Sequence, residues 1–148
     1  GEWCRQNVGS MYGVYDYSSV WGPEDGEWFA CKTSEEVQST TGILYAYSKS
    51  IKRTVDLIRA NGELVSKITG NKRVPLLIFL CNAPVPDKET RKFSKIQLPK
   101  IYTAMAMVSH AGLAEFIIRL LFKLKNPPIP IRSFTDEQKA REWLLQYV

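Results

Sequence analysis

The sequence predicts an α/β fold with a mostly parallel central sheet, an antiparallel hairpin near the N-terminus and about four helices. Three observations predict it. The apolar run at 74–81 has the length of a strand that is covered on both faces. The later part of the chain alternates between such runs and stretches with helical spacing, which favours right-handed crossovers between parallel strands. The first third instead alternates between two faces, as antiparallel strands do.

The N-terminal third is aromatic and predicts three strands. Residues 12–21 alternate between two faces, and the Pro- and Gly-containing segment 22–26 predicts a turn. Residues 28–33 then complete a hairpin, and residues 43–49 form a third strand by the same alternation. We expect a single domain, with an aromatic, strand-rich extension over the first 41 residues and the core over 42–148.

Residues 51–68 change to a helical period, with apolar side chains three, four or seven positions apart. Gly70 and Asn71 offer a stop for this helix. The pair Asn61-Gly62 is also a strong hairpin signal, so a hairpin over 54–68 is the alternative.

The apolar strand at 74–81 ends in Cys81, which we interpret as a small buried hydrophobe. The segment 82–86 predicts a rigid loop, and Asp87 is a good N-cap for the helix that follows. Phe93, Ile96 and Ile101 are expected to face inward on that helix. Pro99 should end or kink it, and residues 103–109 predict another buried strand.

The segment 112–124 has the clearest helical pattern in the chain. Its apolar stripe consists of Leu113, Phe116, Ile117, Leu120, Leu121 and Leu124. Ile118 and Phe122 widen this stripe beyond what one sheet face requires. Either a neighbouring helix covers both residues, or they form an exposed interface for self-association or for a partner protein.

The C-terminal segment predicts a short strand and a helix. Residues 130–134 form the strand, and Thr135 with Gln138 matches a capping box. The inner face of the last helix should consist of Ala140, Trp143, Leu144 and Tyr147.

Composition sets limits on the class of protein. The 148 residues are 45% hydrophobic and 24% charged, as in ordinary globular proteins. No apolar run reaches the roughly 18 residues of a membrane span, and no signal peptide is visible, so a cytoplasmic location is expected. The three cysteines are too few and too scattered for a disulfide framework or a zinc site.

Charge is distributed unevenly along the chain. Residues 1–48 carry a net charge of −5 and the remainder carries +10. Eight bases form the main basic cluster, namely Lys67, Lys72, Arg73, Lys88, Arg91, Lys92, Lys95 and Lys100. Such a cluster could bind nucleic acid or anionic lipid. Because aromatic residues are not interleaved with it, nucleic acid is the disfavoured partner.

Several stretches together carry a family resemblance. They are Val74 to Ile78, Glu89-Thr90-Arg91, Ala104 to Val108, Lys125 to Pro130, and the closing segment from Phe134-Thr135-Asp136-Glu137 to Trp143-Leu144. Over residues 42–148 the chain resembles small STAS-like domains, relatives of anti-sigma factor antagonists. The resemblance implies an α/β sandwich, a regulatory role through protein partners, and, as in some relatives, an ability to hold lipid-like ligands.

The resemblance also implies a place for a regulatory phosphoserine, at the start of the helix after the central strand. This chain has 86–90 there, and the expected Asp-Ser pair is absent. Ser94 lies too deep in the helix, which leaves Thr90 as the nearby hydroxyl. The phosphorylation switch is therefore not expected to operate.

Candidate site residues lie where strands end. Asn82, Asp87, Thr90, Ser109 and His110 follow the two central strands, and open α/β sheets bind ligands at that edge. No catalytic residue, metal site or cofactor is assigned. The leading hypothesis is a non-catalytic module that binds a protein partner or a second copy. The alternatives are a carrier or sensor of a small apolar or anionic, lipid-like ligand, and an enzyme centred on His110.

Overall fold

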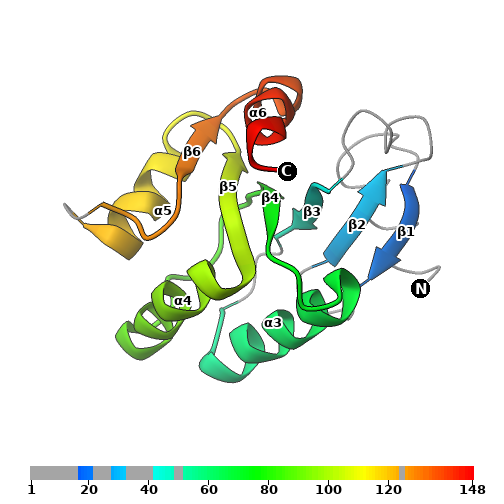
Figure 1. The fold of residues 1–148 in the computed structure, drawn as a ribbon. Coiled ribbons are helices and arrows are strands. Elements are labelled where there is room, and N and C mark those ends of the chain that lie inside the picture. The colour runs from blue at the N-terminus through cyan, green and yellow to red at the C-terminus, as the bar shows by residue number, and fades with distance from the viewer. Residues whose placement is uncertain (1–16, 22–27, 33–41, 49–51, 124–125) are drawn as a thin grey trace.

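The strands form one six-stranded sheet in chain order, with helices on both of its faces (Figure 1). The computed structural model describes residues 17–21, 28–32, 42–48, 52–123 and 126–148. The first two strands, β1 (Tyr17–Trp21) and β2 (Trp28–Lys32), pair antiparallel, and β2 pairs antiparallel with β3 (Leu44–Tyr47). This confirms the hairpin, although the turn predicted at 22–26 lies outside the described residues.

The remaining strands run parallel and alternate with helices, as the sequence predicted. The order is β3, α3 (Val55–Thr69), β4 (Val74–Phe79), α4 (Lys88–Ile101), β5 (Tyr102–Val108), α5 (Leu113–Phe122) and β6 (Ile131–Phe134). The chain closes with α6 (Glu137–Leu144) and the short 3₁₀ helix η1 (Leu145–Tyr147). No helix in the described part of the chain is long and apolar enough to cross a membrane.

The central strands β3, β4 and β5 have two buried faces because they carry apolar residues on both sides. Leu44, Leu76 and Met105 pack with Val65 of α3 and Ala114 of α5. The neighbouring positions on the same strands point the other way, toward α6. Helices α3, α4 and α5 therefore cover one face of the sheet (Figure 1). This follows because successive parallel strands lie side by side in chain order, and crossovers of the same hand place their helices on the same face.

Of the described helices, α6 (with η1 after it) covers the opposite face. Ala140 and Leu144 are fully buried against Leu77 and Tyr45, which confirms the inner face predicted for this helix. Its cap differs from the prediction. Asp136, rather than Thr135, is the N-cap, and its carboxylate accepts a hydrogen bond from the Gln138 N–H at 3.0 Å.

The segment with two competing predictions is a helix, and the hairpin alternative is wrong. Thr54 caps α3 by accepting from the Leu57 N–H at 3.2 Å, and Gly70 ends it with a left-handed φ of 65°. The pair Asn61-Gly62 lies inside the helix and is buried. Asp87 caps α4 as predicted, and Pro99 lies within the last turn of that helix.

Candidate functional site

An apolar cavity of about 320 Å³ lies between the sheet and the helices α3, α4 and α5. Helix α4 has a single buried residue, Thr90, which does not line the cavity. Ile96, predicted to face inward, is 52% exposed. Ile101 lines the cavity, in agreement with its predicted inward position, and Leu98 lines it as well. The cavity is of the size and apolar character that small-molecule sites show.

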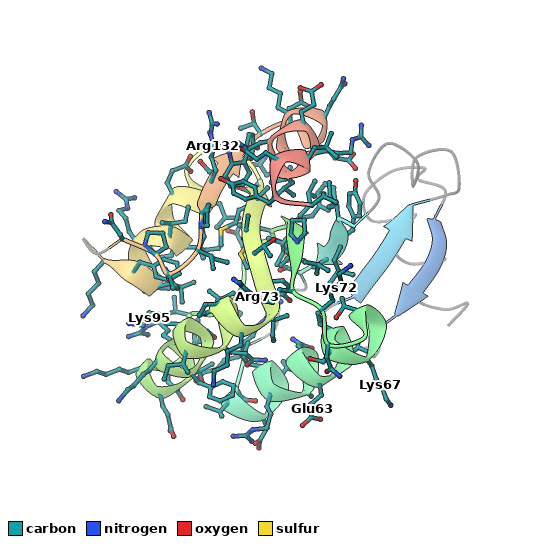
Figure 2. The ribbon with its side chains drawn as sticks, viewed as in Figure 1. Glu63, Lys67, Lys72, Arg73, Lys95 and Arg132 are labelled. Carbon is teal, nitrogen blue, oxygen red and sulfur yellow. The ribbon has the colours of Figure 1, made fainter. Side chains whose placement is uncertain are left out.

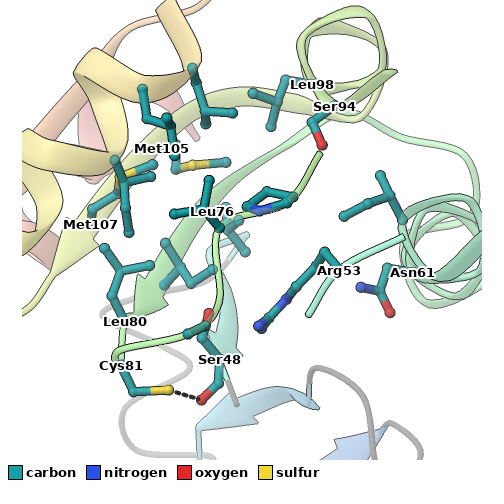
Figure 3. Close-up of a pocket in the computed structure, with 18 of the residues that line it drawn as sticks. Ser48, Arg53, Asn61, Leu76, Leu80, Cys81, Ser94, Leu98, Met105 and Met107 are labelled. Carbon is teal, nitrogen blue, oxygen red and sulfur yellow. Dashed lines mark hydrogen bonds between the residues drawn. The ribbon is translucent and has the colours of Figure 1, made fainter. Parts of the chain in front are cut away.

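The apolar wall of the cavity comes from the sheet and from α5. Leu76, Ile78, Met105 and Met107 project from β4 and β5, and the two methionines lie side by side there (Figure 3). Helix α5 contributes Leu113, Phe116, Ile117, Leu120 and Leu121. Methionine side chains adapt to irregular apolar surfaces, which suits a wall that meets a ligand rather than a fixed neighbour.

The exposed interface, one of the two alternatives for Ile118 and Phe122, does not fit the burial of these residues. Phe122 is 5% exposed and Ile118 packs against the core beside Ala114, so these two do not form an exposed strip. Phe116, predicted to be part of the core, is 47% exposed at the cavity. One arc of the helix contacts the sheet and the adjacent arc lines the cavity, which together need more apolar surface than either alone.

The opposite side of the cavity is polar. Arg53 and Asn61 approach it from the α3 side, Ser48 lies beyond the end of β3, and Ser94 points in from α4 (Figure 3). A molecule that fills the cavity would therefore meet methionine and leucine at one end and donors and acceptors at the other.

Two amide groups on this polar side are buried with unsatisfied atoms. Asn61 is 8% exposed, and its Nδ2 has no hydrogen-bond partner among the described residues. Gln97 donates from Nε2 to the Ile58 carbonyl oxygen at 3.2 Å, while its Oε1 has no partner among the same residues. Buried polar atoms are paired in most native structures, so a buried donor and a buried acceptor are notable here.

The loop between β4 and α4 closes one end of the cavity. Asn82, Pro84 and Pro86 line it, and the prolines restrict the backbone of this loop. Cys81, expected to be a buried hydrophobe, is only half-buried and lines the cavity, and its thiol donates to the Ser48 carbonyl oxygen at 3.2 Å. Asn82 is the one member of the predicted five-residue site that lines the cavity.

Asp87 and Thr90 serve the start of α4 instead. The Thr90 N–H donates to Asp87 Oδ1 at 2.8 Å, and this bond lowers the pKa of the Asp87 carboxyl below its ordinary value. Thr90 is 1% exposed. Its hydroxyl is therefore buried in this conformation, and the absence of a phosphorylation switch stays a prediction.

Ser109 and His110 begin the connection to α5 and lie outside the cavity lining. The Ser109 hydroxyl donates to the His110 carbonyl oxygen at 2.9 Å and accepts from the Ala114 N–H at 3.2 Å. His110 is exposed, and no described residue forms a hydrogen bond with its imidazole. In the described ranges, no group of His, Cys, Asp and Glu residues could hold a metal ion.

Comparison with known proteins supports the fold. The family described as "Domain of unknown function (DUF7793)" matches residues 37–148. The chain is also similar to the crystal structure of an uncharacterized protein of the DUF3478 family, with a SpoIIAA-like fold, from Shewanella loihica PV-4. The two share 16% identity with a TM-score of 0.51, over 90% of this chain and 98% of that one. No curated protein matches the chain.

These findings confirm the STAS-like fold class that the sequence predicted, because SpoIIAA-like and STAS-like describe the same kind of fold. The predicted resemblance is therefore supported at the level of the fold. The family model that matches the chain is DUF7793, which is not a named STAS family. Sequence reasoning missed the cavity residues Arg53, Asn61 and Gln97. The apolar stripe of α5 includes five residues of the lining, but its pattern cannot distinguish a cavity wall from a face that packs on the sheet.

Proposed function

This chain belongs to the DUF7793 family, and we propose that it is a non-catalytic binding module for a small amphipathic molecule. The observation that carries this proposal is the cavity of about 320 Å³, with apolar side chains on one side and polar ones on the other. The ligand would place an apolar body against Met105 and Met107, and a polar or acidic end near Arg53 and Asn61.

Energetics favour such a ligand over an entirely apolar one. Each unsatisfied buried polar atom costs on the order of 1–3 kcal/mol. A ligand group that accepts from Asn61 Nδ2 or donates to Gln97 Oε1 would recover part of that cost. Carboxylic acids, alcohols and amides attached to an aliphatic or aromatic body have this chemistry.

The protein-partner role implied by the STAS-like resemblance fits the same cavity less directly. Val85 and Phe116 line the cavity and are 48% and 47% exposed, so an apolar side chain of a partner could enter there. The small-ligand function accounts for more of the structure, because it also uses the inner polar residues.

Binding of the apolar anionic dye ANS tests the proposal. Ser94→Trp should fill the cavity from α4 without removing a core contact, whereas Glu63→Trp adds the same ring at an exposed position on α3. We expect the wild type and Glu63→Trp to bind one dye per chain, with displacement by a fatty acid. Ser94→Trp should lose at least about tenfold in affinity, which corresponds to about 1.4 kcal/mol.

Native mass spectrometry of freshly purified protein gives a second readout, namely the mass of any co-purified small molecule. The proposal is wrong if ANS does not saturate on the folded wild type, or if Ser94→Trp binds as tightly as Glu63→Trp while retaining its fold. A partner protein that protects the cavity while ANS fails to bind would favour the protein-interaction function.

A further inference from the structure

A second groove, between α4 and α5, is lined almost entirely by basic residues. We define it as the basic groove: Lys88, Arg91, Lys92, Lys95, Leu120, Leu121 and Lys123, around a volume of about 320 Å³. Five cations and two leucines make up this lining, and no carboxylate belongs to it. The hollow itself is apolar, so the charged ends of these side chains lie at its rim rather than inside it.

The structure separates these bases from the rest of the cluster seen in the sequence. Lys95 lies on the side of α4 that faces α5, whereas Lys67, in the last turn of α3, and Lys72, just before β4, lie at the other end of the molecule (Figure 2). Arg73 is engaged elsewhere, since its guanidinium donates to the Tyr102 carbonyl oxygen at 2.9 Å. The basic groove is therefore a local feature and not a consequence of overall charge.

The base and walls of this groove are aliphatic. Leu120 and Leu121 form its floor, and the lysine side chains line it with long methylene stems below their charged ends. An anion with an apolar body fits such a surface better than nucleic acid does, since the groove offers no aromatic ring on which a base could stack. Lipid molecules combine an anionic headgroup with acyl chains.

We propose that the basic groove docks this protein on the surface of a membrane that contains anionic lipid. The four lysines would contact the headgroups, and the two leucines would lie toward the acyl region. The Arg91 guanidinium donates to the Pro86 carbonyl oxygen at 2.7 Å, so it contributes charge beside the groove rather than a free donor. Leu120 and Leu121 also line the apolar cavity, so a docked molecule would hold that cavity close to the lipid. The inference stands on the groove alone and holds whether or not the cavity takes a ligand.

Sedimentation with vesicles tests the proposal. Vesicles of phosphatidylcholine with phosphatidylserine are compared with vesicles of phosphatidylcholine alone. We expect the wild type to bind the anionic vesicles and not the neutral ones. Binding should weaken as salt rises from about 0.1 M to about 1 M, because the screening length falls from about 10 Å to about 3 Å.

Two triple variants with equal net charge separate the groove from general electrostatics. The variant Lys88→Glu with Lys92→Glu and Lys95→Glu reverses the charge of three lysines of the basic groove. Lys67→Glu with Lys72→Glu and Lys139→Glu reverses three exposed lysines elsewhere. One base near an anionic surface contributes about fivefold to partitioning, so the groove variant should lose on the order of a hundredfold. The control should lose less than about tenfold.

Circular dichroism and thermal denaturation establish that both variants are folded. The proposal is overturned if the folded wild type does not bind anionic vesicles, or if the two variants lose binding equally. Salt-sensitive binding of a short DNA duplex without any binding to vesicles would also overturn it, in favour of nucleic acid. Loss of ANS binding together with retained vesicle binding would contradict the cavity function and leave the docking surface standing.

Discussion

Gly62, in the middle of α3, provides a test of how closely α3 and α4 approach each other. A methyl group at this position would overlap Nε2 of Gln97 and lie 3.0 Å from both Cδ of Gln97 and Cδ1 of Ile101. The Gln97 amide therefore occupies the space that a side chain at position 62 would need. Gly62→Ala must displace that amide and break its hydrogen bond to the Ile58 carbonyl oxygen.

Two opposing effects set the size of the change. Alanine is about 1 kcal/mol better than glycine inside a helix. Displacement of Gln97 removes a hydrogen bond worth about 1 kcal/mol, and overpacking in a filled site costs about 1–3 kcal/mol more. We expect Gly62→Ala to lower the free energy of unfolding by about 1–3 kcal/mol.

The sign should reverse when Gln97 is first shortened. In a Gln97→Ala background the overlap is gone, and only the contact with Ile101 has to relax by a few tenths of an ångström. Gly62→Ala should then raise stability by up to about 1 kcal/mol, so the double-mutant cycle should show a coupling of about 2 kcal/mol. Urea denaturation of the four proteins measures this. Equal stabilisation by Gly62→Ala in both backgrounds would refute the close approach of the two helices.

Two further predictions concern the ends of helices. Asp136→Ala should lower the free energy of unfolding by about 1 kcal/mol, because Asp136 is the N-cap of α6. Thr135→Ala should leave that free energy almost unchanged. The midpoints of urea denaturation distinguish the two variants, and a larger loss of stability in Thr135→Ala would support the capping box instead. The Ser133 hydroxyl, which donates to Glu115 at 2.8 Å, lowers the pKa of Glu115 below its ordinary value. The stability that this carboxylate contributes should be complete above pH about 4.5 and should be lost as pH falls through the lower folded pKa. Melting temperatures of Glu115→Gln should therefore fall below those of the wild type at neutral pH and converge with them in acid, whereas Glu63→Gln should follow the wild type throughout.

The order of helices and strands was determined by the sequence because it depends on local pattern. The apolar run that became β4 predicted a strand with two covered faces, and its partners on both faces are α3 and α6. Asp87 and Gly70 predicted the start of α4 and the end of α3, since caps satisfy backbone groups within a turn of themselves.

Tertiary packing decided the structure of segments whose local sequence signals conflicted or allowed more than one arrangement. The pair Asn61-Gly62 favours a turn in isolation, but in the fold a residue without a side chain lets Gln97 approach α3. The α5 stripe marked a wide apolar surface, and only its placement showed which arc contacts the sheet and which lines the cavity. The cavity itself depends on how far α4 stands from the sheet, a distance between segments that no local pattern encodes.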